Sequence, residues 1–221
     1  MSEAGLAHPH GHVDHFESPE RRREAVVFGM WVFLATEIMF FGGLFGVYSV
    51  YRFEFHEAFV AGSRRLDLVL GTFNTFLLLT SSLTMVLAVQ AAVVDNRRRC
   101  SLLLALTMAL GAGFLVIKGF EYEHKLHAGL LPVLGLPFAE TGPHARGMQL
   151  FMSLYVGMTG LHALHMVIGL GLLGWLLTIA RSEKSWAARG EAVDIVGLYW
   201  HFVDLAWIFL FPLLYLVDRS S

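Results

Sequence analysis

Ionisable side chains lie inside long apolar segments of this sequence. They are Glu37 in WVFLATEIMFF, His162 and His165 in GLHALHMVIG, and His201 and Asp204 in YWHFVDLAW. Carboxyl and imidazole groups can transfer protons, and imidazole can also bind metals or haem iron. A charged side chain at the centre of a membrane costs about 2.5–3.5 kcal/mol on insertion scales, so these groups are expected to face protein, water or each other.

The spacing of these residues predicts two polar helix faces. One holds Met158, His162, His165 and Gly169, and the other holds His201 and Asp204. For His162 and His165, the simplest interpretation is hydrogen bonding between helices. For His201 and Asp204, it is a structural pair that ties one helix to its neighbour. A lone carboxyl in an apolar helix is harder to explain as structure, so Glu37 is a candidate for a functional group.

The composition indicates an integral membrane protein. Of the 221 residues, 56% are hydrophobic and 15% are charged, and the mean hydropathy is +0.59. Soluble domains average about 45–50% apolar and about 25% charged residues. The formal net charge is only −2, so there is no global positive field that would attract nucleic acid. The single cysteine, Cys100, excludes an internal disulfide and a thiolate cluster.

Apolar runs long enough to cross a bilayer, roughly 17–25 residues each, predict an all-α fold with five transmembrane helices in one domain at 25–217. The expected spans are about 25–51, 67–92, 101–121, 148–180 and 193–217. The first run is too long for a signal peptide, so we expect a retained membrane anchor. A polar tail at 1–24 precedes the domain, and a short end at 218–221 follows it. The tail's HPHGHVDHF could bind a transition metal, although a solvated tail is the simpler interpretation.

Lysine and arginine are unevenly divided between the two sides of this bundle. The side of the N-terminus has the larger set, Arg21, Arg22, Arg23, Arg97, Arg98, Arg99, Arg181, Lys184 and Arg189, and the other side has Arg52, Arg64, Arg65, Lys125, Arg146 and Arg219. Because cytoplasmic segments carry the excess of positive charge, we expect the N-terminus inside and the C-terminus outside, which is the periplasm for a bacterial inner membrane. Glu37 then lies about 18 Å from the inner end of the first span.

Other residues are expected to shape the helix contacts. Lys118 in IKGFEYEHKLH belongs to a charged outer helix end, where it can reach toward water and pair with Glu121 or Tyr122. Asn74 is a structural polar residue of the second span. Small residues, which let helix backbones approach closely, are Gly42, Gly43, Gly46, Gly71, Ser81, Ser82, Gly169, Gly171 and Gly174.

Taken in order, these segments resemble subunit III of the haem–copper oxidases. The matching segments are GMWVFLATEIMFFGGLFGVY at 29–48, LDLVLGTFNTFLLLTSSLTM at 66–85, KGFEY at 118–122, GLHALHMVIG at 160–169 and YWHFVDLAWIFLFPLLYL at 199–216. The resemblance includes the family's intramembrane glutamate, at Glu37, and its Asn-Thr pair, at Asn74 and Thr75.

The resemblance implies an accessory subunit without catalytic residues or metal, packed against the catalytic haem–copper subunit I and other oxidase subunits. The haem and copper would lie in those partners, in an aerobic complex that reduces O₂ to water and pumps protons. It further implies phospholipid bound in a cleft, and support of proton uptake and stability of the catalytic subunit. Carried over, Glu37 is the carboxyl of that cleft, with His162 or His165 as its partner across a helix interface.

The sequence departs from the family at its N-terminal side. Many relatives have two further helices before the first span found here, and their lipid cleft lies between that pair and the remaining five. The tail followed by HFESPE resembles the short bacterial forms, so we expect a complete short chain. Lipid sites that depend on the missing pair would then need helices from another subunit.

Other functions stay open on the sequence. A quinol oxidase or a nitric-oxide-reductase-associated homologue would share these helices, because another subunit chooses the electron donor. A small proton or solute transporter could use a relay of Glu37, His162, His165 and Asp204, although no inverted repeat is visible. A dihaem membrane cytochrome could use His162 or His165 with His201, and would show a Soret band in the isolated subunit.

Overall fold

The computed structural model describes residues 19–131, 142–181 and 187–217, and every element within these ranges is an α-helix. In order, they are α1 (Pro19–Glu54), α2 (His56–Arg64), α3 (Leu68–Val93), α4 (Arg97–His127), α5 (Ala145–Arg181) and α6 (Ala187–Tyr215). Five of them, all except α2, are long and apolar enough to span a membrane. This confirms the predicted all-α membrane bundle, whereas the side of each terminus stays a prediction. The His-rich part of the tail and the end at 218–221 lie outside the described residues.

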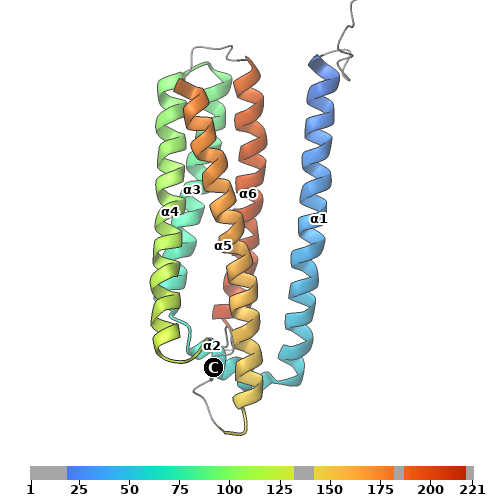
Figure 1. The fold of residues 1–221 in the computed structure, drawn as a ribbon, viewed down its shortest axis with the longest axis vertical. Coiled ribbons are helices and arrows are strands. Elements are labelled where there is room, and N and C mark those ends of the chain that lie inside the picture. The colour runs from blue at the N-terminus through green and yellow to red at the C-terminus, as the bar shows by residue number, and fades with distance from the viewer. Residues whose placement is uncertain (1–18, 132–141, 182–186, 218–221) are drawn as a thin grey trace, which may run out of the picture.

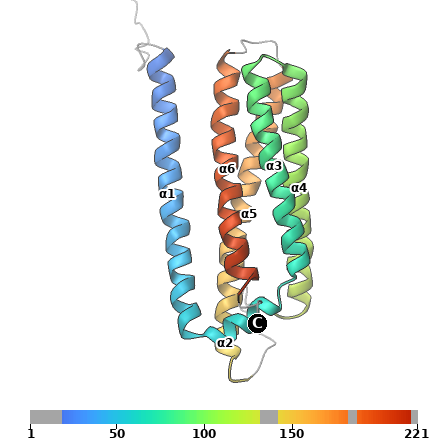
Figure 2. The same ribbon diagram turned by 180° about the vertical axis from the view of Figure 1, so that it is seen from behind.

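Helices α3, α4, α5 and α6 form a four-helix bundle, and α1 runs along one side of it (Figure 1). Within the bundle, the neighbours of α1 are α5 and α6, and the view from behind places α3 and α4 farther from it (Figure 2). The short helix α2 lies across the end of the bundle at which α1 ends and α5 begins. The path of the chain therefore brings the end of α1, the start of α5 and the end of α6 to the same side of the membrane.

Local sequence signals explain how α3 and α4 begin and meet. Asp67 accepts hydrogen bonds from two backbone N–H groups of the first turn of α3, at 2.9 and 3.1 Å, and Asn96 accepts one from the first turn of α4 at 3.1 Å. Such caps satisfy N–H groups that have no partner within the helix. Asp95 adopts a left-handed backbone with φ of 56°, which lets the chain reverse tightly between the two helices.

Two features differ from the expected spans. The expected spans assign no helix to the segment between the first two of them, but this segment forms the amphipathic helix α2, which buries Ala58, Phe59, Gly62 and Ser63. Helices α1, α4 and α5 also extend beyond the expected spans at both ends. A helix can continue into the polar region because the hydrocarbon core is only about 30 Å thick.

The small residues do not all act as expected. A Cβ added to Gly111 would lie 2.6 Å from the ring of Trp200, and one added to Gly169 would lie 2.9 Å from the same ring. One added to Gly71 would lie 2.8 Å from the ring of Tyr215. These glycines make room for aromatic rings rather than for a neighbouring backbone. The prediction of close helix approach is wrong for Gly42, Gly43, Gly46, Gly171 and Gly174, because nothing lies within 4 Å of an added Cβ there.

Candidate functional site

Glu37 of α1 contacts a histidine of α5 across the space between these two helices. Oε2 of Glu37 lies 3.1 Å from Nε2 of His165, and the two side chains are 19% and 10% exposed. Of the two histidines considered as partners of Glu37, the fold brings His165 to the carboxyl and turns His162 elsewhere. We refer to this contact as the Glu37–His165 pair.

The second ring nitrogen of His165 determines where protons can reside in this pair. Nδ1 lies 2.9 Å from the backbone oxygen of Leu161. A carbonyl oxygen can only accept a hydrogen bond, so Nδ1 carries a proton and donates it to Leu161. The contact between Nε2 and Glu37 then requires one further proton, held either by the carboxyl or by the ring. In both cases the pair has no net charge, which explains how a carboxyl is tolerated at membrane depth.

Aromatic rings surround His165 and orient it. The ring of Phe41 lies 5.6 Å from the imidazole, centroid to centroid, and the ring of Tyr199 stacks on it at 6.5 Å. The Tyr199 hydroxyl also donates a hydrogen bond to the backbone oxygen of His165 at 3.0 Å. The pair is therefore held by α1, α5 and α6 together, among aromatic side chains.

A second polar cluster is centred on Glu121 of α4. Its carboxylate accepts hydrogen bonds from Lys118 at 2.8 Å and from Lys125 at 2.5 Å, and from the hydroxyl groups of Tyr155 at 3.0 Å and Tyr215 at 2.8 Å. We call these five residues the lysine–glutamate cluster. The hydroxyl groups come from α5 and α6, so the cluster joins three helices.

The location of this cluster differs from the expectation. Lys118 pairs with Glu121 as anticipated, but the two residues are only 3% and 4% exposed, so Lys118 does not extend toward water. Its ammonium instead lies 4.7 Å from the centre of the Trp207 ring, where the face of the ring attracts a cation. Burial is possible because the carboxylate, the tyrosines and this ring replace the hydration of the lysine.

Three predicted polar residues lie inside the bundle without hydrogen bonds to other described side chains. Asn74, His162 and Asp204 are 0%, 1% and 3% exposed, and none of their side-chain nitrogen or oxygen atoms has a partner. His162 packs between the rings of Phe114, at 5.4 Å, and Trp207, at 5.1 Å. The expected common stripe of His162 and His165 is thus divided, because one faces the bundle interior and the other faces α1.

The expected pairing of His201 with Asp204 does not occur. Nδ1 of His201 instead lies 2.8 Å from the hydroxyl of Ser82 on α3. The Asp204 carboxyl also lies near Ser82, but without the geometry of a hydrogen bond. A link between α6 and α3 therefore exists at this level, and it is made by His201 and Ser82.

Several members of these sites were not identified from the sequence. Lys125 follows Glu121 by one helical turn, so its spacing was a usable signal. Tyr155 and Tyr215 belong to distant segments, and nothing in their local sequence indicates a contact with Glu121. Within the described ranges, no three His, Cys, Asp or Glu side chains gather as a possible metal site.

Among the described residues, five helices apolar enough to cross a membrane and the polar contacts between them define an integral membrane protein of the helical-bundle class. The sequence matches the family model described as "Cytochrome c oxidase subunit III" over residues 17–218. The chain therefore belongs to the cytochrome c oxidase subunit III family, whose members are accessory subunits of the haem–copper oxidases.

Individual relatives agree with this assignment. The chain is 34% identical to "Cytochrome c oxidase subunit 3" of Thermostichus vulcanus, over 94% of this chain and 93% of the relative. It is 32% identical to "Probable cytochrome c oxidase subunit 3" of Nocardia farcinica, over 89% of this chain and 90% of the relative. It also matches "Heme-copper oxidase subunit I+III" of Aeropyrum pernix, at 32% identity over 94% of this chain and 24% of that longer polypeptide.

Proposed function

We propose that this chain is the metal-free, non-catalytic subunit III of an aerobic terminal oxidase. Its partners are the catalytic haem–copper subunit I, other oxidase subunits and membrane phospholipid, and the haem and copper reside in those partner subunits. The observation that carries this proposal is the Aeropyrum pernix polypeptide, whose name combines subunits I and III and which matches 94% of this chain. Two subunits that are fused in one organism are expected to pack together where they are separate.

The complex is proposed to oxidise cytochrome c, as the names of the relatives indicate. In a quinol oxidase or a nitric-oxide-reductase-associated complex, the electron donor would differ and the role of this chain would be the same. We place the protein in a bacterial inner membrane, with the tail at 1–24 in the cytoplasm, the domain at 25–217 in the membrane and the end at 218–221 in the periplasm. The larger number of lysine and arginine residues on the N-terminal side supports this orientation.

Within the complex, the Glu37–His165 pair is proposed to hold a proton at membrane depth and to connect α1 to the bundle. The pair is neutral in both of its proton arrangements, so a proton can move from the carboxyl to Nε2 without creating net charge. This arrangement is suited to supporting proton uptake and the retention of the catalytic centre. It does not involve binding of oxygen or transfer of electrons by this chain.

The partner is tested by isolating the tagged chain in mild detergent and recording a reduced-minus-oxidised spectrum. We expect haem bands from a larger subunit that is isolated together with the chain, and no haem bands once the chain is separated from it. A colourless, homogeneous preparation with all five spans intact would overturn the oxidase proposal and favour the transporter alternative.

The role of the pair is tested with two substitutions of different chemistry. Glu37→Gln retains an N–H that can donate to Nε2 of His165 but removes the titratable carboxyl, whereas Glu37→Leu removes both. If the shared proton matters, both variants assemble with nearly normal initial turnover and lose activity faster than wild type during sustained turnover. Glu24→Gln, an exposed substitution on the same helix, is the control.

Other results would change the assignment of the pair. If only Glu37→Leu lost activity faster than wild type during sustained turnover, the pair would have a purely structural role in holding α1. Loss of the assembled oxidase in both variants would likewise show that the contact is needed for assembly and not for proton supply.

A further inference from the structure

We propose that a pocket between the end of α1 and the start of α5 binds the headgroup of a zwitterionic phospholipid. In this assignment, Arg146 contacts the phosphate and Glu54 contacts the positively charged amine. The inference rests on the proposed function in one respect, namely that membrane phospholipid is a partner of this chain. It goes further by naming the site, the headgroup class and the leaflet, which is the one at which α1 ends.

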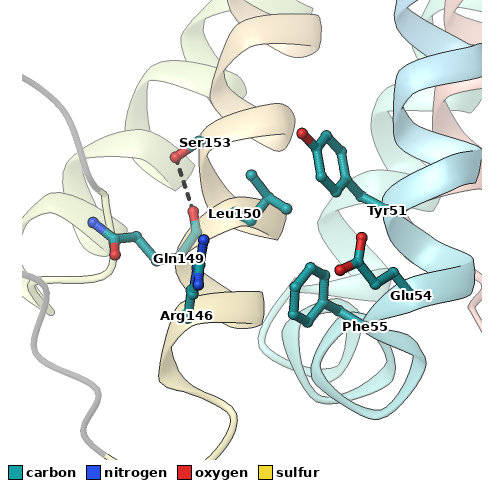
Figure 3. A pocket seen from close by; sticks show the side chains of 7 residues that line it. All are labelled: Tyr51, Glu54, Phe55, Arg146, Gln149, Leu150 and Ser153. Carbon is teal, nitrogen blue, oxygen red and sulfur yellow. Dashed lines mark hydrogen bonds between the residues drawn. The ribbon is translucent and has the colours of Figure 1, made fainter.

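The pocket is an open cavity of about 320 Å³ between two helices that are far apart in the sequence. Tyr51 and Glu54 line it from the end of α1, and Phe55 lines it from the junction between α1 and α2 (Figure 3). The first turns of α5 contribute Arg146, Gln149, Leu150 and Ser153. Its lining therefore combines aromatic and aliphatic side chains with neutral polar ones, and includes one cationic and one anionic side chain.

The two walls are held in place by close packing at the end of the bundle. An added Cβ on Gly147, which follows Arg146, would lie 2.6 Å from Cβ of Ala58 in α2. The first turn of α5 is therefore seated against α2, which continues directly from α1 through Phe55. The pocket does not have to be assembled by its ligand, since both sides are already fixed.

The two charged side chains of the lining are complementary to a zwitterion. Arg146 and Glu54 are both exposed, and neither makes an ion pair or side-chain hydrogen bond with another residue of the described ranges. The planar guanidinium of arginine matches phosphate oxygens in a two-point contact, and a carboxylate accepts hydrogen bonds from an ammonium group. An anionic headgroup without an amine would leave Glu54 opposed to negative charge, so the pair of charges favours a headgroup such as phosphatidylethanolamine.

The depth of the pocket agrees with a lipid headgroup. It lies where α1 leaves its apolar run, next to Tyr51 and Phe55, and aromatic residues are enriched at this level of a membrane. One turn deeper, Val47 and Val50 of α1 are 45% and 65% exposed and offer an apolar surface to acyl chains. From Tyr51 to Glu37, the helix rises about 21 Å, whereas the hydrocarbon of one leaflet is about 15 Å thick. The headgroup site is therefore distinct from the Glu37–His165 pair.

The test uses the assembled oxidase carrying the wild-type chain, Arg146→Gln, Glu54→Gln or Arg52→Gln. Arg52 lies in the last turn of α1 and does not line the pocket, so its substitution controls for a general loss of positive charge. Each complex is exchanged into bilayer discs that contain equal amounts of phosphatidylethanolamine and phosphatidylglycerol. It is then returned to detergent, and the retained lipids are extracted and measured by mass spectrometry.

We expect Arg146→Gln to retain about tenfold less phosphatidylethanolamine, since the charge-assisted contact to the phosphate is lost. Glu54→Gln should shift retention from phosphatidylethanolamine toward phosphatidylglycerol, and Arg52→Gln should resemble wild type. Equal retention by wild type and Arg146→Gln would overturn the site. A loss in Arg146→Gln without any shift in Glu54→Gln would overturn the zwitterionic assignment.

The haem spectrum of each preparation separates this inference from the proposed function. Haem bands with unchanged lipid retention would reject the pocket alone. The absence of haem from the wild-type preparation would reject the oxidase assignment, whatever lipids the chain retained.

Discussion

In the most apolar stretch of α6, 56% of the residues are buried, whereas in that of α1 only 11% are buried, although α1 is the more apolar of the two helices. In water this relation would be reversed, because the more apolar segment gains more from burial. In a membrane, an apolar side chain gains little from burial in protein, because the lipid tails around it are equally apolar. Helices then associate through close packing and through polar contacts between them. Burial in this protein consequently follows the distribution of polar and aromatic contacts, not hydropathy.

The contacts themselves show the same contrast. Within the bundle, Trp200 donates to Ser81 and Trp207 donates to Thr75, each at 3.0 Å, and the lysine–glutamate cluster joins three helices. Helix α1 is connected to the bundle by the buried Tyr48 hydroxyl, which donates to the backbone oxygen of Leu213 at 2.6 Å, and by the Glu37–His165 pair. An exposed ion pair of Arg23 with Glu191, at 3.9 Å, is a weaker link of the kind that adds little stability. Each contact of α1 therefore has a larger share in keeping it in place, and the pocket at its end lies on this lightly attached side.

The largest effect is expected inside the bundle, at the centre of the lysine–glutamate cluster. Glu121→Gln would leave two buried lysines without the carboxylate that both of them contact, which destabilises by about 3–5 kcal/mol. The measurement is the yield and thermal midpoint of the complex in detergent. Glu123→Gln is the control, because its side chain is 64% exposed. Equal midpoints for the two variants would show that the cluster does not hold the bundle together.

The second-largest effect is expected for a glycine-to-alanine substitution, which compares the packing of the bundle with that of α1. Gly111→Ala places a Cβ against the buried ring of Trp200 and should cost about 1–3 kcal/mol. Gly43→Ala on α1 should leave the thermal midpoint of the complex unchanged, because nothing lies within 4 Å of the added atom. A larger drop in thermal midpoint for Gly43→Ala than for Gly111→Ala would mean that this face of α1 is tightly covered in the complex. It would contradict an exposed α1.

A smaller effect is expected for the attachment of α1. Tyr48→Phe removes the hydrogen bond to Leu213 and should cost about 0.5–1.5 kcal/mol. Amide hydrogen exchange should rise in α1 and remain unchanged in α3 and α4. Tyr51→Phe on the same helix serves as the control. Increased exchange throughout all the helices would show that α1 and the bundle unfold as one unit.

The smallest effect is expected for a single polar contact within the bundle. Ser82→Ala removes the partner of His201, and such contacts between membrane helices average about 0.6 kcal/mol. The control is Ser49→Ala, since the Ser49 hydroxyl donates only to a carbonyl of its own helix, that of Phe45. The shift in thermal midpoint should be measurable for Ser82→Ala and smaller for Ser49→Ala. Matching shifts would indicate that His201 finds another partner.

Much of the architecture could be predicted from local sequence. The five spans follow from apolar runs, and the starts of α3 and α4 follow from Asp67 and Asn96, because a cap is a contact between neighbours in the chain. The pairing of Lys118 with Glu121 was also predictable from helical spacing. The helix α2 was missed because its amphipathic pattern is short and lies among charged residues, where a loop is equally consistent with composition.

The sequence by itself determined which segments leave water, which family the chain resembles, and that Glu37 needs a partner. The tertiary structure decided that this partner is His165, that Glu121 gathers two lysines and two tyrosines, and that α1 stays largely exposed beside a close-packed bundle. The physical reason is that hydropathy measures transfer from water to an apolar phase, in which lipid and protein are nearly equivalent. The choice among helix partners depends on the directions and distances of a few polar and aromatic side chains, which exist only once the helices are packed.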